Sequence, residues 1–269
     1  MIFVPSSITC IFSPQIGEKA ADSGSVGVGF TIDIGVLAER ADGVWVNGKQ
    51  VSFPTVEHVV ERLGLSGVKI DAQLPFGCGF GMSGASALAA AALAEISLIE
   101  AADLAHEAEV ANLTGLGDVA TQTFGGVVVR KNAACPSRLI FERFHFAAEL
   151  DFLILGELPT REFLRERARD VREEGRRWTK EFLKLPTLEN LFRCSLNFAK
   201  ATGLLEEVAD VVEAVQSGGG AASMIMLGKA VFAYKGFEAL KEFGEPFKAR
   251  IDCCGVRWVE GSRSAVQNR

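Results

Sequence analysis

The feature that most constrains this chain is a glycine-rich segment at residues 75–85, Pro-Phe-Gly-Cys-Gly-Phe-Gly-Met-Ser-Gly-Ala. It joins an apolar, strand-like stretch at residues 68–74 to an alanine-rich, helical stretch at residues 85–98. Its four glycines lack a Cβ, so backbone N–H groups can converge on an anion, and the N-terminus of the following helix adds its positive dipole end. The segment therefore predicts a phosphate-binding loop, with Ser83 at the start of the helix.

Composition indicates an ordinary globular protein with one large domain or two lobes. The chain has 269 residues, of which 48% are hydrophobic and 23% charged, and its net charge is −6. An acidic chain is poorly suited to broad neutralisation of phosphates, so we expect no nucleic-acid partner. The sequence has neither a basic leader followed by a long apolar run nor an apolar run that could span a bilayer. We therefore expect a soluble, cytoplasmic protein with no membrane partner.

Cysteine spacing favours reduced thiols. The six cysteines include no Cys-x-x-Cys pair, and the adjacent Cys253 and Cys254 are badly placed to bridge to each other. A zinc site formed by these two cysteines with His58 or His145 is a minor alternative.

Periodicity predicts a β-rich N-terminal region followed by mixed helices and strands. Asn47-Gly48 is the strongest hairpin signal. The hydrophobic pattern predicts strands within residues 2–4, 27–37, 44–46, 50–53, 68–74, 125–130, 138–144, 152–155 and 230–234, and helices within residues 55–63, 85–99, 101–112, 187–200 and 204–216. We expect the first lobe to end near residues 145–150.

Residues 161–184 are a dense run of charge, with nine basic and six acidic side chains. Opposite charges such as Arg169 and Glu173 recur at helical i, i+4 spacing. An RNA contact or a lid over a site would need the basic residues on one stripe, and here acidic residues interrupt them. The pattern predicts a solvated helix face.

The glycine-rich loop could belong to several nucleotide-binding classes. Residues 79–84 spell Gly-x-Gly-x-x-Gly, but a dinucleotide fold needs a strand after the helix that carries an acidic residue for the ribose. Residues 85–112 instead predict a helix followed by a helix, with Asp103 inside the second. A Walker A loop needs a lysine where Met82 stands. The remaining class is a nucleotide loop that uses backbone amides, a helix dipole and the hydroxyl of Ser83.

Residues 75–85 resemble the second conserved motif of the GHMP kinases, the family of galactokinase, homoserine kinase, mevalonate kinase and phosphomevalonate kinase. Residues 115–126, which contain Gly-Leu-Gly-Asp and later Gly-Gly, and the glycine-rich residues 217–222 resemble further family segments in family order. The resemblance implies an α+β fold of two lobes. These are a ribosomal protein S5-like N-terminal lobe at residues 1–148 and a ferredoxin-like C-terminal lobe at residues 149–269.

Within that family the chain is most similar to the archaeal pantoate kinases. The similarity lies in residues 79–85, 105–109, 114–119 and 222–233, whereas residues 5–9, Pro-Ser-Ser-Ile-Thr, depart from the usual Pro-Gly-His-x-Thr. The resemblance implies an enzyme that uses ATP and Mg²⁺ to phosphorylate the primary hydroxyl of pantoate in coenzyme A biosynthesis, and a homodimer. Alternatives that stay open are another GHMP enzyme (a homoserine, mevalonate or shikimate-type kinase, or a sugar-phosphate synthase relative) and a non-catalytic nucleotide sensor.

The resemblance also implies roles for the residues on the nucleotide side. Ser83 and Glu109 would hold Mg²⁺ as hard oxygen ligands. Glu107 is the rival metal ligand, because it precedes Asp118 by eleven residues. On a helix, His106 and Glu109 share a face, whereas Glu107 points about 100° away from His106. The nucleotide phosphates would lie against Pro75, Gly77, Gly79, Phe80, Gly81, Met82, Ser83, Gly84 and Ala85.

On the acceptor side, Asp118 is the candidate base or orienting group for the hydroxyl, and its catalytic partners are Glu109 and Ser83. Arg130 would bind the pantoate carboxylate, with His106 and Ser25 as hydrogen-bond partners. Structural alternatives stay open: a turn cap for Asp118, a surface ion pair for Arg130 and a satisfied helix histidine for His106.

Overall fold

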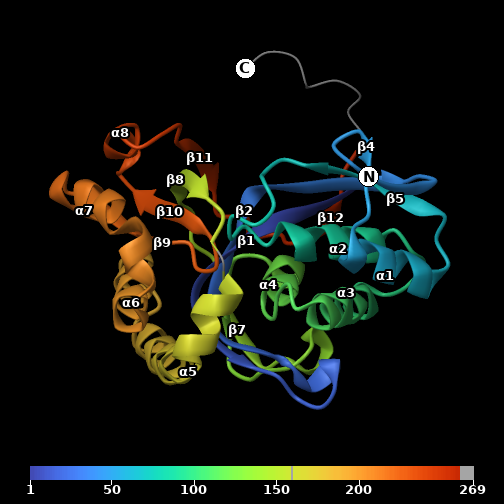
Figure 1. The fold of residues 1–269 in the computed structure, drawn as a ribbon, viewed down its shortest axis with the longest axis horizontal. Coiled ribbons are helices and arrows are strands. Elements are labelled where there is room, and N and C mark those ends of the chain that lie inside the picture. Colours follow the sequence, from blue (N-terminus) through green and yellow to red (C-terminus); the bar gives the residue numbers. More distant parts are fainter. Residues whose placement is uncertain (159, 261–269) are drawn as a thin grey trace.

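The computed structural model describes residues 1–158 and 160–260, with the backbone alone for residues 160–167. Two long antiparallel strands, β1 (Ile2–Gln15) and β2 (Gly24–Arg40), form the spine of the molecule (Figure 1). The prediction of a strand at residues 2–4 found only the first part of β1, because the buried Ser6, Ser7 and Thr9 interrupt its apolar pattern. The register of β1 against β2 shifts between Pro5 and Ser6 and again after Thr9.

Six further strands complete the larger sheet around β1 and β2. Its order is β12-β1-β2-β5-β3-β4, and β6 pairs with β2 and β7. Asn47 and Gly48 both have positive φ in the β3–β4 turn, which confirms the predicted hairpin. The added strands are β3 (Gly43–Val46), β4 (Lys49–Gln50), β5 (Gly67–Ala72), β6 (Val127–Arg130), β7 (Phe141–Phe144) and β12 (Arg257–Trp258).

The smaller sheet has the order β11-β8-β10-β9, and its neighbouring strands are antiparallel. With helices between the first and second strands and between the third and fourth, this is the βαββαβ arrangement of ferredoxin-like folds. The α+β fold class is therefore confirmed. The elements are β8 (Glu149–Gly156), β9 (Ala221–Met224), β10 (Lys229–Tyr234), the short α8 (Phe237–Leu240) and β11 (Phe247–Arg250).

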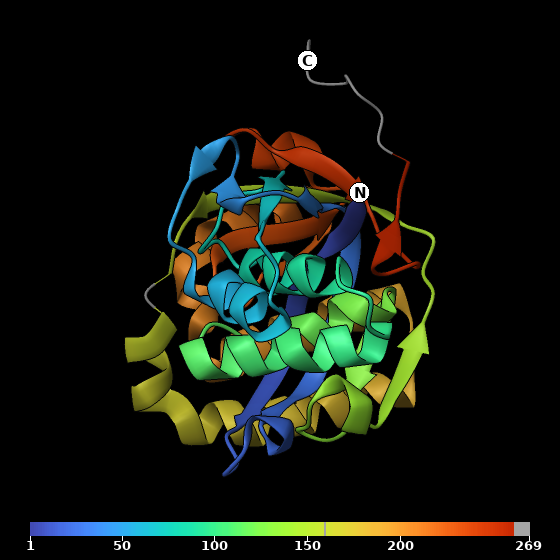
Figure 2. The ribbon, with the colours of Figure 1, turned by 90° about the vertical axis from the view of Figure 1, so that its right-hand side faces the viewer.

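Helices lie in two groups that cover different parts of the sheets (Figure 2). Helix α2 lies between the larger sheet and α3, and its run of buried alanines permits close packing on both sides. The first group is α1 (Pro54–Leu63), α2 (Met82–Ala92), α3 (Leu98–Asn112) and α4 (Asp118–Phe124). The second is α5 (Thr160–Lys184), α6 (Leu188–Thr202) and α7 (Ala209–Ser217), which pack on β1 and β9.

Two helical predictions differ from the structure in detail. The helix predicted at residues 85–99 ends at Ala92, and α3 begins after a capping box formed by Ser97 and Glu100. The turn predicted around Asp118 is instead the first turn of α4, a helix too short to give a clear periodic signal.

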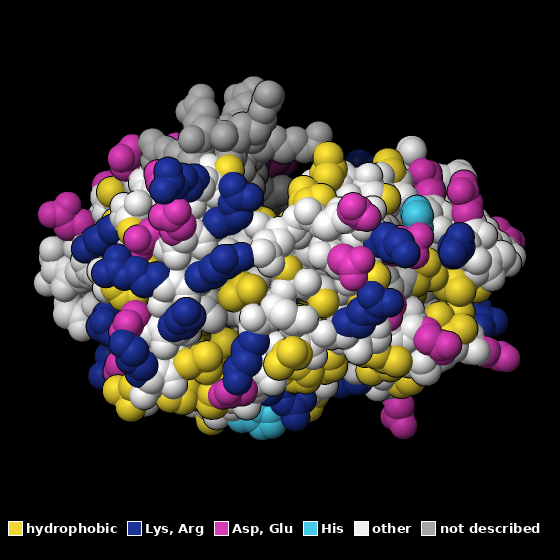
Figure 3. Space-filling model, turned by 90° about the horizontal axis from the view of Figure 1, so that it is seen from below, with side chains coloured by type: hydrophobic (Ala, Val, Ile, Leu, Met, Phe, Trp, Pro, Cys, Tyr) yellow, Lys and Arg dark blue, Asp and Glu magenta, His cyan; other side chains and the backbone are white. Residues whose placement is uncertain are grey.

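The charged run at residues 161–184 lies on α5, as predicted, although the side chains of residues 161–167 are outside the described part. Ion pairs on its exposed face include Arg169–Glu173 and Lys184–Glu181. Lys and Arg alternate with Asp and Glu across much of the face in Figure 3. No helix in the described residues is both long and apolar enough to cross a bilayer.

The smaller sheet begins at Glu149, and later the chain returns to the larger sheet, where β12 pairs with β1. The division into lobes at residues 148 and 149 stays a prediction.

Candidate active site

The glycine-rich loop lies between β5 and α2 in a conformation that requires glycine. Gly77, Gly79 and Gly81 have φ values of +78°, +88° and +62°, in the left-handed region that side chains disfavour. A Cβ on Gly79 would lie 3.0 Å from the backbone nitrogen of Gly228, in the turn between β9 and β10. The loop is thus packed backbone to backbone against the β9–β10 turn of the smaller sheet.

Helix α2 begins at this loop with an uncapped N-terminus. No described side chain caps its first turn at Gly81, and the first amides of an α-helix have no intrahelical partner. Gly81, Met82 and Ser83 line a cavity of about 700 Å³. A helix N-terminus of this kind favours phosphate groups.

The Ser83 hydroxyl is held in a small cluster of oxygen atoms. It donates a 2.6 Å hydrogen bond to Oε1 of Glu109 on α3 and lies 3.1 Å from Oγ1 of Thr55 on α1. Thr114 donates a second hydrogen bond of 2.7 Å to the same Oε1 atom. Ser83 and Glu109, separated in sequence, therefore present hard oxygen donors side by side at the start of α2.

Glu109 is a buried carboxyl, only 2% exposed. Burial raises its pKa from 4.5 to about 7, and the hydrogen bonds from Ser83 and Thr114 oppose that shift. The negative charge of Asp118 also raises the pKa of Glu109, and no basic side chain among the described residues lowers it. Within the described part of the chain this carboxyl therefore has no counter-charge. A bound cation would supply the missing charge.

Asp118 is the first residue of α4 and lines the same cavity. Thr9 on β1 donates a 3.3 Å hydrogen bond to its Oδ1 atom. Burial raises the pKa of Asp118, and the positive charge of Arg130 is the largest opposing influence. A carboxyl with a raised pKa is better able to accept a proton near neutral pH.

Gly115 brings the two carboxyl groups together. A Cβ at this position would overlap Oε2 of Glu109 and would lie 3.2 Å from Oδ2 of Asp118. Gly115, in the connection between α3 and α4, thus lies against both acids, and a side chain there would force the Glu109 carboxyl to move.

Arg130 supplies a buried cation in the cavity wall. It is 1% exposed, and its guanidinium donates to the backbone carbonyl of Ser25 at 3.0 Å and to Oγ1 of Thr121 at 2.7 Å. A Cβ on Gly117 would lie 2.9 Å from the guanidinium carbon. Ser25 also lines the cavity, so the structure brings Arg130, Ser25 and Asp118 to one wall.

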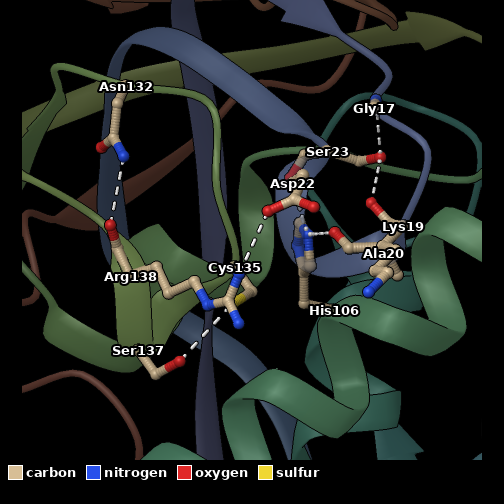
Figure 4. Close-up of polar contacts among 10 residues, drawn as sticks. All are labelled: Gly17, Lys19, Ala20, Asp22, Ser23, His106, Asn132, Cys135, Ser137 and Arg138. Carbon is tan, nitrogen blue, oxygen red and sulfur yellow. Dashed lines mark hydrogen bonds and ion pairs between the residues drawn. The ribbon is translucent and has the colours of Figure 1, made fainter.

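His106 lies behind that wall, and it is not among the cavity-lining residues. Its Nε2 atom is 3.0 Å from the carbonyl of Ser23 and 3.2 Å from that of Ala20. Figure 4 shows the ring directed at this loop. Burial lowers its pKa, and the two carbonyl contacts oppose the shift. His106 therefore contacts the segment that leads to Ser25, and its predicted contact with substrate stays a prediction.

Glu107 faces away from the cavity. Its side chain is 43% exposed, and its carboxylate lies 3.8 Å from Nε2 of His58 on α1. Of the two glutamates proposed as metal ligands, only Glu109 lies beside Ser83 in the structure.

The remaining lining of the cavity is mainly apolar, but it also includes Glu157, whose carboxyl carbon would lie 2.9 Å from a Cβ on Gly77. Phe53 and Phe76 meet edge to face with ring centroids 5.3 Å apart. Pro75, Gly84 and Ala85, which the sequence placed on the nucleotide, do not line the cavity. Among the described residues, no three His, Cys, Asp or Glu side chains gather as a metal site, so Cys253 and Cys254 with either histidine form no such cluster.

Sequence reasoning missed several residues that complete the site. Thr9, Thr55 and Thr114 hold Asp118, Ser83 and Glu109 in place. Thr114 stands in the quoted Thr-Gly-Leu-Gly-Asp segment, and Thr9 in the quoted residues 5–9, so the motifs contained the signal. The glycines at residues 218–220 lie elsewhere: Gly218 lines a different hollow, whereas Met226 and Leu227 reach the cavity.

Sequence comparison places the chain among phosphotransferases. A family model described as the GHMP kinases N terminal domain matches residues 51–126. The chain is 33% identical to a pantoate kinase of Methanocaldococcus jannaschii over 94% of this chain and 98% of that protein. It is 34% identical to a pantoate kinase of Thermococcus kodakarensis over 86% of each chain.

Solved structures of phosphotransferases share the fold of this chain. A phosphotransferase related to the coenzyme A biosynthesis pathway superposes with a TM-score of 0.85 at 30% identity, covering 96% of this chain and 98% of the other. The Methanococcus jannaschii mevalonate kinase superposes with a TM-score of 0.67 at 18% identity, covering 93% and 98%. The second likeness shows a shared fold.

Proposed function

The chain belongs to the GHMP kinase family, and we propose that it transfers the γ-phosphoryl group of ATP to the primary hydroxyl of pantoate, forming 4-phosphopantoate and ADP for coenzyme A biosynthesis. The observation that carries this proposal is the wall formed by Arg130, Ser25 and Asp118. It offers a carboxylate-binding cation beside a carboxyl that can receive a hydroxyl proton. Pantoate carries both of the groups that such a wall would bind.

Arg130 suits the pantoate carboxylate. Its planar guanidinium can donate two parallel hydrogen bonds to a carboxylate, and the surrounding protein fixes its position. The hydroxyl of Ser25, on the same wall, is a further partner for the acceptor.

Asp118 orients the acceptor hydroxyl and takes its proton. The hydroxyl oxygen forms a bond to the γ-phosphorus as the bond from that phosphorus to the β,γ-bridging oxygen breaks, and ADP leaves. Phosphoryl transfer depends mainly on positioning and charge neutralisation. The amides at the start of α2 stabilise the phosphate oxygens, and the apolar wall at Phe53 and Phe76 suits the adenine ring.

Ser83 and Glu109 fit Mg²⁺, because both are hard oxygen donors and no basic side chain in the described part of the chain stands beside Glu109. When bound, the metal would neutralise charge on the phosphates. Glu109 binds it best as a carboxylate, so its raised pKa makes proton release part of metal binding.

A screen of acceptors tests the proposed function. The purified protein would be incubated with MgATP and, in turn, pantoate, homoserine, mevalonate or shikimate, and phosphorylated products would be identified by ³¹P NMR. We expect transfer to pantoate. Transfer to another acceptor with none to pantoate would refute the substrate assignment in favour of another GHMP activity, and ATP binding with no transfer to any acceptor would favour the nucleotide sensor.

Cytoplasmic location, a homodimer and the absence of nucleic-acid and membrane partners are further parts of the proposal. The acidic composition supports the absence of a nucleic-acid partner, and the family resemblance supports the homodimer. Gel filtration with light scattering would measure the assembly.

A further inference from the structure

Gln122 contacts the glycine-rich loop from α4, one helical turn after Asp118. It is fully buried, and its Nε2 atom donates a 2.8 Å hydrogen bond to the backbone carbonyl of Gly81. The same carbonyl accepts the first intrahelical bond of α2, from the amide of Ala85 at 3.0 Å. One oxygen atom thus joins the loop, α2 and α4.

This contact lies at the point where the loop and α4 come closest. A Cβ on Gly81 would lie 2.9 Å from Nε2 of Gln122 and 3.1 Å from Cβ of Asp118. The loop therefore rests directly on the turn of α4 that carries Asp118, and the only side-chain hydrogen bond across this contact is that of Gln122. This statement covers the described residues.

The surroundings of the amide oxygen of Gln122 give no stability reason for a glutamine at this position. Its Oε1 atom has no hydrogen-bond partner among the described residues. It lies 3.2 Å from the Cβ position of Gly84, in the first turn of α2. An unpaired buried acceptor is destabilising, which offsets the hydrogen bond made by Nε2. A side chain selected for stability alone would pair both ends.

We propose that Gln122 is a positioning residue, which fixes the phosphate loop at the distance from Asp118 that in-line transfer requires. The inference rests on the proposed function, because it takes the loop as the phosphate site and Asp118 as the group that orients the acceptor. Gln122 itself does not line the cavity, so it acts through Gly81. The acceptor and the nucleotide each keep their own contacts without it, and only their mutual alignment is lost.

Two substitutions test this role. Gln122→Met keeps the length of the side chain and removes the donor, and Gln122→Glu places a carboxylate against the Gly81 carbonyl. We expect kcat to fall about 10- to 100-fold in Gln122→Met and further in Gln122→Glu, while the separate dissociation constants for an ATP analogue and for the acceptor change less than about three-fold. ATP hydrolysis to water should rise relative to transfer, because the acceptor is misaligned.

Thr123→Val is the matched control. Thr123 is buried on the same helix, and its hydroxyl bonds only to the carbonyl of Val119 within α4. We expect it to lower the melting temperature without changing kcat or the ratio of hydrolysis to transfer.

The inference is overturned if Gln122→Met keeps wild-type kcat and the wild-type ratio of hydrolysis to transfer, whatever its melting temperature. It is also overturned if the variant loses affinity for ATP alone while kcat at saturation is unchanged, because Gln122 then only shapes the loop. If Gln122→Met does not fold, the same two readouts in Gln122→Glu decide. A wild-type protein that transfers nothing to pantoate counts against the proposed function, and the comparison is then made with the acceptor found in the screen.

Discussion

The proposed nucleotide side and the proposed acceptor side of the cavity are built in different ways. The nucleotide side is centred on one continuous segment, the loop at residues 75–85 and the start of α2, and it presents backbone amides with Ser83. The acceptor side is assembled from β1, β2, α4 and β6, which contribute Thr9, Ser25, Asp118 and Arg130.

The two sides also differ in charge. Among the described residues no basic side chain lowers the pKa of Glu109, on the proposed nucleotide side, whereas Arg130 lowers that of Asp118 on the proposed acceptor side. A metal ion could therefore bind at Glu109, whereas the charge of Asp118 is already balanced by Arg130. In the proposed kinase, this separation would direct Mg²⁺ to the phosphates and the anionic acceptor to Arg130. The following substitutions test it, from the largest expected effect to the smallest.

Asp118→Asn should disable the acceptor side most completely. An amide cannot take the hydroxyl proton, so we expect kcat to fall by about three orders of magnitude, with little change in the affinity for ATP. Steady-state kinetics with the phosphorylated product quantified would measure this. Asp42→Asn, an exposed aspartate far from the cavity lining, is the control. A decrease in kcat of less than about ten-fold would show that Asp118 is not the base.

Glu109→Gln tests, through the stability of the protein, whether Glu109 lacks a counter-charge. The pKa of Glu109 rises on folding from 4.5 to about 7. The contribution of this shift to the free energy of unfolding is therefore fully present below pH 4.5 and is lost as the pH rises to 7. Above that pH the wild-type chain carries the cost of the buried charge, on the order of 3 kcal/mol. In EDTA without nucleotide, Glu109→Gln should melt several degrees higher than wild type at pH 8 and at nearly the same temperature at pH 5. A lower melting temperature at pH 8 would contradict the raised pKa.

Arg130→Met tests the cation on the acceptor side. Loss of a charge-assisted, bidentate contact should raise KM for pantoate roughly 10- to 100-fold, with KM for ATP nearly unchanged. Arg130→Lys keeps the charge and loses the planar fork, so it should fall between wild type and Arg130→Met. Equal increases in both KM values would show that Arg130 supports the whole cavity and not the acceptor alone.

Thr114→Val should give the smallest effect. It removes one donor to Glu109 and raises the pKa of that carboxyl further. We expect kcat/KM for MgATP to fall about five-fold at pH 6.5 and to recover at pH 8.5, where Glu109 is ionised in both proteins. An equal loss of kcat/KM at both pH values would show that Thr114 does not act through the ionisation of Glu109. Thr123→Val again serves as the control.

Much of the nucleotide side could be predicted from sequence because its determinants are local. Glycines at positions with positive φ and a following helix need no distant partner to indicate a phosphate loop. The placement of Glu109 beside Ser83, and of Glu107 toward His58, followed from helix packing. Spacing along α3 showed only that the two glutamates face different directions.

The acceptor side was harder to predict, because its parts are brought together by strand pairing. Arg130 lies beside Gly27 only because β6 pairs with β2, and Thr9 meets Asp118 only because α4 packs on β1. The position of His106 shows the limit of the motif: its segment matched the resemblance, yet its ring contacts the loop at residues 20–23. Helix α4 was missed because seven residues give too short a periodic signal.

The sequence by itself determined a phosphate loop of the GHMP type, an α+β chain and the acids and cation available for chemistry. Those conclusions rest on residue types at fixed local spacing, which backbone stereochemistry and side-chain chemistry limit strongly. Only the tertiary structure decided which glutamate joins Ser83, which wall holds Arg130 with Asp118, and that Gln122 ties the loop to α4. The hydrogen bonds Ser83–Glu109, Gln122–Gly81 and Thr9–Asp118 join residues 26, 41 and 109 positions apart in the chain. Packing between elements, which no local pattern specifies, sets their distances.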